Sequence, residues 1–65
     1  MYKMIQVVGT SPKGFSEAVE NGIKALDKQG EKIFWFEVIE QRGAVRENKI
    51  SEYQVKINVG VQSGK

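Results

Sequence analysis

The clearest pattern in the sequence is an alternation of apolar side chains with polar side chains or glycine over residues 52–61, within a predicted strand at residues 50–61. A two-residue period places every second side chain on the same side of a β-strand, so this stretch predicts a strand with one buried face. We therefore expect a sheet whose apolar face is covered by another layer. The two faces of this strand would carry Tyr53, Val55, Ile57, Val59 and Val61 on one side and Glu52, Gln54, Lys56 and Asn58 on the other.

A strand, a turn and a helix are predicted near the start of the chain. Residues 2–8 alternate as a strand, and two glycines with a proline mark the turn that follows. A helix is predicted over residues 16–28, with Ser16 capping its first amides and Gly30 suited to a left-handed conformation after its end. Gly22 inside the helix indicates close approach of the sheet or of a neighbouring subunit. The apolar stripe of the helix consists of Phe15, Val19, Gly22, Ile23 and Leu26.

The second predicted strand is long and leads into a tight reversal. It covers residues 33–45, and residues 46–49 form the reversal, where Asn48 suits a positive φ. The order is β-α-β-β, an α+β fold in which an antiparallel sheet needs the third strand at its centre. Residues 62–65 are expected to form a frayed end. The helix is expected to cover a face made by Phe36, Val38, Val55, Ile57 and Val59.

The opposite face of the predicted sheet has no helix to cover it. Glu37 and Glu40 are three residues apart on the predicted strand, so they point to opposite faces and cannot act as a carboxylate pair within one subunit. Glu40 then shares a face with Arg42, where a solvated or interface salt bridge is favoured. The uncovered face would carry Trp35, Glu37, Ile39, Gln41, Gln54 and Lys56.

The size of the chain bounds how it can be stabilised. Its 65 residues allow one domain, expected to span residues 1–65. A domain this small buries only about 60% of its unfolded surface, so it needs disulfides, a metal or self-association. Cys and His are both absent, which excludes disulfides and a structural zinc site. We therefore expect a homo-oligomer without a bound metal.

The charge pattern narrows the range of partners. Ten Lys and Arg against eight Asp and Glu give a net charge of +2, and the charges are interspersed. Clustered basic residues are typical of proteins that bind nucleic acid. A helix that spans a membrane needs about 20 mainly apolar residues. The sequence shows neither pattern and no secretory signal at its start. We expect a cytoplasmic protein that binds neither nucleic acid nor membrane.

The sequence offers no catalytic constellation. Without Cys and His, a nucleophilic triad would need Lys or carboxylates, and the serines have turn, cap or tail positions. The turn at residues 9–14 precedes a helix, where phosphates bind, but it lacks the Gly-Lys-Ser/Thr ending of a P-loop. We expect no enzyme. Arg42 could hold a phosphate or a neighbour's carboxylate, and the sequence leaves both open.

Trp35, the only tryptophan, is the most informative side chain. An indole on a half-polar sheet face can pack against another subunit or stack on a flat ligand. Gln54 offers two donors and one acceptor group, which suit the edge of a heterocycle. Trp35 and Gln54 together would make a minimal site for a flat ring, and the subunit contact stays open as the alternative.

Four segments together resemble the dodecin family. They have the family's order and spacing without a gap, and they span nearly the whole chain. The resemblance implies a β-α-β-β subunit whose antiparallel sheet partly wraps its helix, and twelve copies in a hollow homododecamer. The segments are Val8-Gly9-Thr10-Ser11, then Trp35-Phe36-Glu37-Val38 with Glu40 and Arg42-Gly43, then Tyr53-Gln54-Val55, and finally Val59-Gly60.

The resemblance also implies a function without turnover. Dodecins bind flavins such as riboflavin, FMN or lumichrome, and their proposed role is flavin storage, buffering and photoprotective quenching. By resemblance, Trp35 stacks on the flavin between symmetry-related subunits, and Gln54 bonds the isoalloxazine edge. Arg42 matches a family arginine that holds subunit contacts or the FMN phosphate. Glu37 and Gln41 would line the same surface.

The chain also departs from the family pattern. An aromatic and a basic residue usually follow Val59-Gly60, and here these are Val61 and Gln62, which weakens the case for FMN over riboflavin. Gly30 stands where a core leucine is usual, which would loosen subunit packing. The alternative function is a structural or interaction module with Trp35 in a subunit contact and no flavin. The native flavin, ions on symmetry axes and a second ligand such as coenzyme A stay open.

Overall fold

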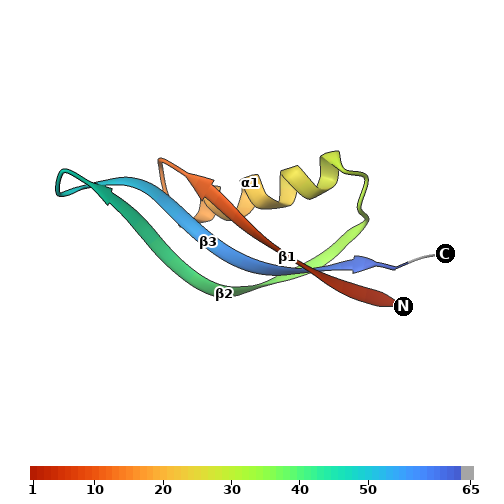
Figure 1. Ribbon diagram of the computed structural model, residues 1–65. Helices are drawn as coiled ribbons and strands as arrows, with labels where there is room; N and C mark the ends of the chain where they lie inside the picture. The colour runs from red at the N-terminus through yellow and green to blue at the C-terminus, as the bar shows by residue number, and fades with distance from the viewer. Residues whose placement is uncertain (64–65) are drawn as a thin grey trace.

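The computed structural model describes residues 1–63. Its elements are, in chain order, β1 (Tyr2–Ser11), α1 (Phe15–Lys28), β2 (Ile33–Arg46) and β3 (Lys49–Gln62). The strands form one antiparallel sheet in the order β1-β3-β2, and α1 lies along one face of it (Figure 1). The predicted α+β class, the β-α-β-β order and the central third strand are confirmed.

The helix begins one residue earlier than predicted, and its N-cap differs. Gly14 is the N-cap, α1 starts at Phe15, and no side chain caps its first amides. The prediction of Ser16 as the N-cap is wrong because Ser16 lies inside the first turn. The turn is short because β1 continues to Ser11, whose Oγ accepts a hydrogen bond of 2.9 Å from the Lys13 backbone N–H.

The C-terminal end of the helix follows the prediction. Gly30 has a φ of 87°, a conformation that glycine adopts without steric cost. Its N–H donates to the Asp27 carbonyl (2.9 Å), and the Glu31 N–H donates to the Leu26 carbonyl (3.3 Å). These two bonds form a Schellman motif, which satisfies carbonyls that the helix end leaves free.

The β2–β3 hairpin is the longest part of the molecule. The protein measures 48 × 20 × 13 Å, and the hairpin turn lies at the end opposite the N-terminus (Figure 1). Glu47 and Asn48 both have positive φ, 54° and 64°. Two such residues make the type I′ turn that matches the twist of a hairpin, so the prediction for Asn48 is confirmed.

The third strand runs further than predicted. Gln62 belongs to β3, and the Ser63 N–H donates a hydrogen bond of 2.9 Å to the Met1 carbonyl. The predicted frayed end is therefore wrong for Gln62 and Ser63, because both are tied to the first strand or its end. Gly64 and Lys65 lie outside the described residues.

The core lies between α1 and the half of the sheet formed by β1 and β3. Gly9 and Gly22 meet where the helix crosses β1, and a Cβ at Gly9 would overlap the Ala18 carbonyl. The close approach of the sheet predicted from Gly22 is thus confirmed. The buried apolar side chains are Ala18, Leu26, Val55, Ile57, Val59 and Val61.

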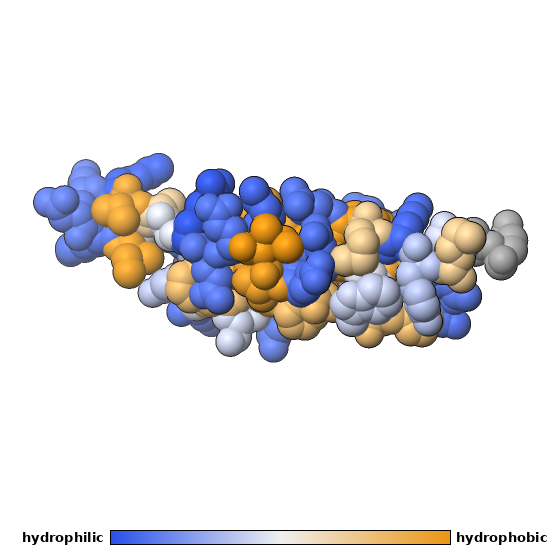
Figure 2. Space-filling view, turned by 90° about the horizontal axis from the view of Figure 1, so that it is seen from below, coloured by the Kyte–Doolittle hydropathy of each residue, from blue (hydrophilic) through white to orange (hydrophobic). Residues whose placement is uncertain are grey.

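The helix leaves β2 uncovered, which corrects one prediction. Phe36 and Val38 were expected beneath α1, but they remain 47% and 43% exposed. The cause is that the glycine contact holds α1 over β1 and β3, away from the β2 edge. Figure 2, seen from below the view of Figure 1, also shows apolar surface between hydrophilic residues on the side away from the helix.

Two β-bulges change which side chains share a face of β2. One shift lies between Ile33 and Trp35, and another lies between Val38 and Glu40. An extra residue in one strand flips every side chain that follows it. Gln41 therefore lies opposite Val55, on the helix side of the sheet, and its predicted place beside Trp35 is wrong.

The same bulges regroup three other side chains. Ile39 is the extra residue of the second bulge, and Glu37 and Glu40 now lie on the same face, opposite Asn58 and Lys56. The prediction that these two glutamates point to opposite faces is therefore wrong. Arg42 shares the face of Glu40, as predicted.

Candidate functional site

The face of the sheet away from α1 holds most of the predicted site residues. We call it the open face. The strand register places on it Trp35, Glu37, Glu40 and Arg42 of β2, Gln54, Lys56, Asn58 and Gly60 of β3, and Tyr2, Met4, Gln6 and Val8 of β1.

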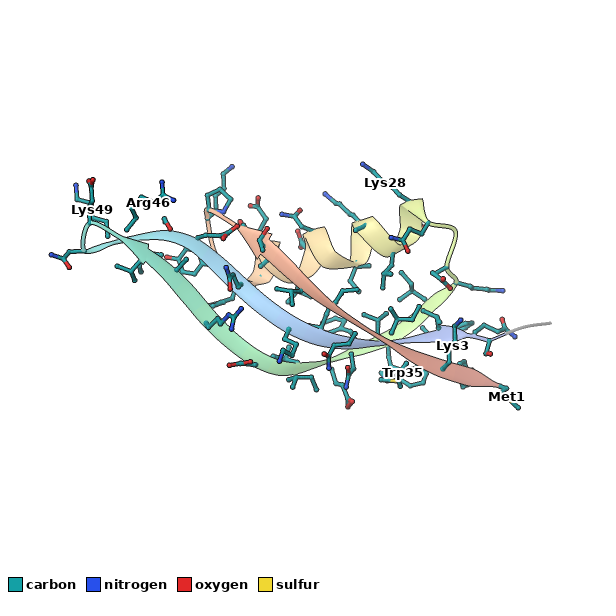
Figure 3. All side chains as sticks on the ribbon, viewed as in Figure 1. Met1, Lys3, Lys28, Trp35, Arg46 and Lys49 are labelled. Carbon is teal, nitrogen blue, oxygen red and sulfur yellow. The ribbon has the colours of Figure 1, made fainter. Side chains whose placement is uncertain are left out.

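Trp35 lies on the open face with its indole over Gly60, its opposite residue on β3. A Cβ at Gly60 would lie 2.5–2.6 Å from three atoms of the six-membered ring, so only glycine leaves room for this position. Trp35 stays 42% exposed and lies on the side of the sheet away from the helix (Figure 3). The ring is supported from below by backbone and can accept a flat partner.

One aromatic ring contacts this indole, and a second aromatic ring contacts the first. The Tyr2 ring meets the Trp35 ring in a T-shaped contact, with centroids 5.1 Å apart and planes at 75°. Phe34 meets Tyr2 in the same manner, at 5.3 Å and 71°. Tyr2 is not among the site residues predicted from the sequence. Its signal was the register: Tyr2 alternates with Met4 on β1, on the side where the indole reaches across β3.

The other end of the open face carries a polar cluster. Arg42 donates a hydrogen bond of 2.7 Å from Nε to Gln54 Oε1, and Gln54 Nε2 donates one of 3.1 Å to Glu52 Oε1. Lys56 and Glu40 form an ion pair of 3.5 Å beside them, and both are partly exposed. The Gln54 amide is therefore held with its oxygen toward Arg42 and its nitrogen toward Glu52.

The structure does not bring Trp35 and Gln54 together within one chain. Trp35 lies opposite Gly60, and Gln54 precedes Gly60 by six residues on the same strand. At about 3.3 Å per residue the two positions are about 20 Å apart, too far for one ring system to contact both. Glu37 lies toward the Trp35 end, and Arg42 lies at the Gln54 end. A ring held by both residues must therefore lie between two chains.

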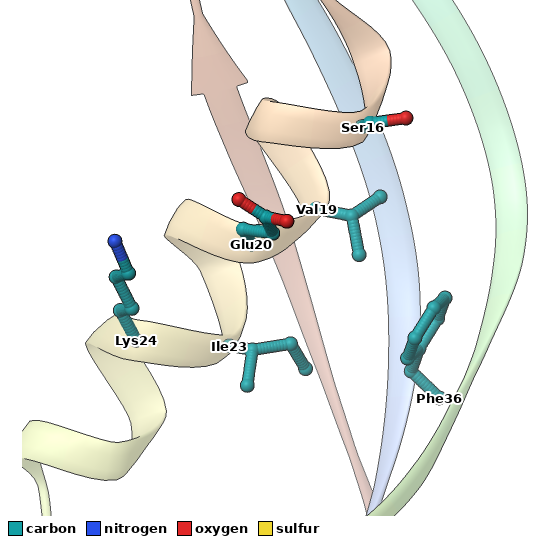
Figure 4. A pocket seen from close by; sticks show the side chains of 6 residues that line it. All are labelled: Ser16, Val19, Glu20, Ile23, Lys24 and Phe36. Atoms are coloured by element: carbon teal, nitrogen blue, oxygen red, sulfur yellow. The ribbon is translucent and has the colours of Figure 1, made fainter.

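A separate groove runs between α1 and β2 on the helix side. It encloses about 520 Å³ and is lined by Val19, Ile23 and Phe36, with Ser16, Glu20 and Lys24 at its border. Figure 4 shows Val19 and Ile23 pointing from the helix toward Phe36. The groove is apolar because it is the part of the core that α1 leaves uncovered.

The described residues lack two further features. Within residues 1–63 no three or more His, Cys, Asp or Glu gather as they would around a metal ion. The only helix of this region, α1, is too short and too polar to cross a membrane.

Comparison with known proteins identifies the family. The family model Dodecin matches residues 1–63. The chain is 38% identical to a dodecin of Thermus thermophilus over 60 residues, which cover 92% of this chain and 87% of the relative. The dodecin structure from Streptomyces davaonensis superposes with a TM-score of 0.94 at 35% identity, over all of this chain and 96% of that one.

The description of a third relative names an ion. A Mycobacterium tuberculosis structure, described as a calcium-chelating immunodominant antigen, calcium dodecin, superposes with a TM-score of 0.86 at 31% identity. The superposition covers 98% of this chain and 91% of that one. The β-α-β-β order, the three-stranded antiparallel sheet and the open-face tryptophan define a small sheet protein with one helix. The chain belongs to the dodecin family.

Proposed function

We propose that this chain is a non-enzymatic flavin-binding protein, in which the isoalloxazine ring of the flavin stacks on Trp35. The observation that carries the proposal is the exposed indole lying over Gly60, on a chain of the dodecin family. Offset stacking on an aromatic face adds to the burial of both rings. The stacked indole is also an electron donor close to the flavin, so it would quench the excited state. The protein would store, buffer and photoprotect flavin in the cytoplasm without turnover.

The proposed flavin site is completed by a second chain in a hollow homododecamer. One chain cannot bring Trp35 and Gln54 to the same ring, since about 20 Å separates them. The chain also exposes 4780 Å², whereas a compact monomer of 7.3 kDa would expose about 4200 Å². This excess and the apolar groove beside Phe36 favour coverage by other copies.

Gln54 is the proposed contact to the pyrimidine edge of the ring. Arg42 uses one lone pair of its oxygen, and Glu52 accepts one of its two N–H groups. One donor and one acceptor position stay free, which match a heterocycle that presents a carbonyl beside an N–H. Glu37 is retained as a neighbour of the ring, whereas Gln41 is not, because it lies on the helix side.

The alternative is a structural module in which Trp35 fills a subunit contact and no flavin binds. The two functions differ in what Trp35→Ala would do. Flavin binding predicts that the variant assembles normally and loses at least about tenfold in flavin affinity. The structural alternative predicts a smaller species in size-exclusion chromatography.

The experiment is a titration of the assembled protein with riboflavin and then with FMN. The emission of the flavin and of Trp35, the only tryptophan, should fall together and saturate near one flavin per chain. The ratio of the two affinities tests whether Gln62, in place of a basic residue, favours riboflavin. Intact assembly without mutual quenching would refute flavin binding.

A further inference from the structure

Trp35 belongs to an aromatic corner formed by Tyr2, Phe34 and Trp35. The corner lies where β1, β3 and β2 run side by side near the N-terminus. Each of its three side chains is roughly half exposed: Tyr2 55%, Phe34 47% and Trp35 42%. Three neighbouring aromatic rings with this much exposure form a surface that is available to a ligand.

The corner has a floor and a side wall. The floor is the indole, which starts on β2 and lies over Gly60 of the central strand, so it extends toward β1. The wall is the Tyr2 ring on β1, whose plane stands at 75° to the indole with centroids 5.1 Å apart. A flat ring stacked on the indole would therefore have Tyr2 along one side.

Phe34 supports the orientation of the Tyr2 ring. Its ring contacts Tyr2 at 5.3 Å and 71°. Phe34 reaches Tyr2 because it is the extra residue of the first β-bulge of β2, immediately before Trp35. T-shaped pairs of this kind add to the stability of an aromatic cluster beyond the area that they bury.

We infer that Tyr2 is a positioning residue for the flavin: it fixes the plane of the Trp35 indole and limits how far a stacked ring can slide toward β1. This inference rests on the proposed flavin function. Without the Tyr2 ring, the indole keeps its support from Gly60 but loses its contact on the β1 side. Both the orientation of the indole and the position of the ligand then become less defined.

The test compares Tyr2→Leu and Tyr2→Phe in the assembled protein. Leu keeps apolar volume without a ring, and Phe keeps the ring without the hydroxyl. We expect Tyr2→Leu to weaken riboflavin and lumichrome binding by about threefold to tenfold, the range for the loss of one aromatic pair, and Tyr2→Phe to bind within about twofold of the unchanged protein. Lumichrome is included because it has the ring system without the ribityl chain.

A second readout reports the indole without any ligand. Near-ultraviolet circular dichroism of the single tryptophan should weaken in Tyr2→Leu and recover in Tyr2→Phe. Phe15→Leu is the matched control, because Phe15 forms a T-shaped pair with Tyr53 at 5.0 Å and 77°, on the helix side of the sheet. It should leave both readouts unchanged.

The outcomes separate the inference from the function on which it rests. If the unchanged protein binds flavin and Tyr2→Leu, still fully assembled, binds as tightly, the inference is wrong and the flavin function stands. If the unchanged protein shows no quenching, both are wrong. If Tyr2→Leu does not assemble, Phe34→Leu replaces it in the test. This variant removes only the contact that supports the Tyr2 ring, so it should lose less riboflavin and lumichrome affinity. Unchanged binding in that variant would then overturn the inference.

Discussion

Trp35 lies flat over Gly60, its opposite residue on the central strand, with no room for a Cβ between them. A methyl group at Gly60 would meet the ring at 2.5 Å, and the half-exposed indole would move rather than the strand. We expect Gly60→Ala to assemble and to lose about tenfold in flavin affinity, since it displaces the stacking surface. The measurement is the riboflavin titration, with the anisotropy of the Trp35 emission as a second readout.

Gly43→Ala is the control for this substitution. Gly43 is a strand glycine too, but it lies on β2. A Cβ added there would lie 3.6 Å from the nearest atom, the Glu52 carbonyl oxygen, which is an ordinary contact. It should bind flavin as the unchanged protein does. Equal affinities in Gly60→Ala and Gly43→Ala would show that the indole position does not determine binding.

Arg42 offers a test of two roles that the sequence leaves open. If it orients the Gln54 amide through their 2.7 Å hydrogen bond, Arg42→Met should weaken riboflavin and FMN by the same factor, about fivefold for one exposed hydrogen bond. If it holds the phosphate, only FMN should lose affinity. We expect the equal loss, measured as dissociation constants for both ligands in low salt.

Lys56→Met is the matched control for charge. Lys56 lies on the same face and pairs with Glu40, so its loss removes one positive charge without touching the Arg42–Gln54 bond. A loss of FMN affinity in Arg42→Met alone, with riboflavin unaffected, would contradict the orienting role and favour phosphate binding by Arg42. An equal loss of FMN affinity in both variants would reflect the removed positive charge.

Gly9 and Gly22 are in contact, yet substitution by alanine is expected to have opposite effects on stability at the two positions. Gly9→Ala should destabilise the protein by about 1–3 kcal/mol, since its Cβ would overlap the Ala18 carbonyl and force α1 off the sheet. Gly22→Ala should be neutral or stabilising by up to about 1 kcal/mol, because its Cβ would lie at an ordinary 3.5 Å from Gly9 Cα and alanine favours the helix.

The thermal midpoint of each variant would be compared at one fixed protein concentration, because assembly shifts the midpoint. A higher midpoint for Gly9→Ala than for Gly22→Ala would contradict the close packing of α1 on β1 at these two glycines.

The strand order, the hairpin turn at Asn48 and the helix end at Gly30 could be predicted from the sequence, because each depends on local chemistry. The alternation of β3, the positive φ of Asn48 and the left-handed Gly30 are properties of neighbouring residues. The β-bulge after Val38 could not be predicted, because it depends on how β2 pairs with β3. It moved Gln41 to the helix side.

The candidate site was predicted in its parts but not in its arrangement. Trp35 and Gln54 lie on the open face, as the alternation of the strands indicates. Their separation of about 20 Å follows only from the register, which sets Trp35 against Gly60. Tyr2 was missed because its role depends on a strand that is distant in sequence and adjacent in space.

The groove beside Phe36 predicts how the assembly can be broken. Phe36 is 47% exposed within one chain, so covering the rest of its ring would contribute roughly 2 kcal/mol per copy. We expect Phe36→Glu to fold but to elute as a smaller species, because a charge in the apolar groove cannot be covered without a partner. Lys28→Glu places the same charge near the end of α1, outside the residues that line the groove, and should assemble normally. Size-exclusion chromatography with light scattering gives the mass, and far-ultraviolet circular dichroism checks the fold. Full-size assembly of Phe36→Glu would mean that the groove stays open to solvent in the oligomer and that the contact between copies lies elsewhere.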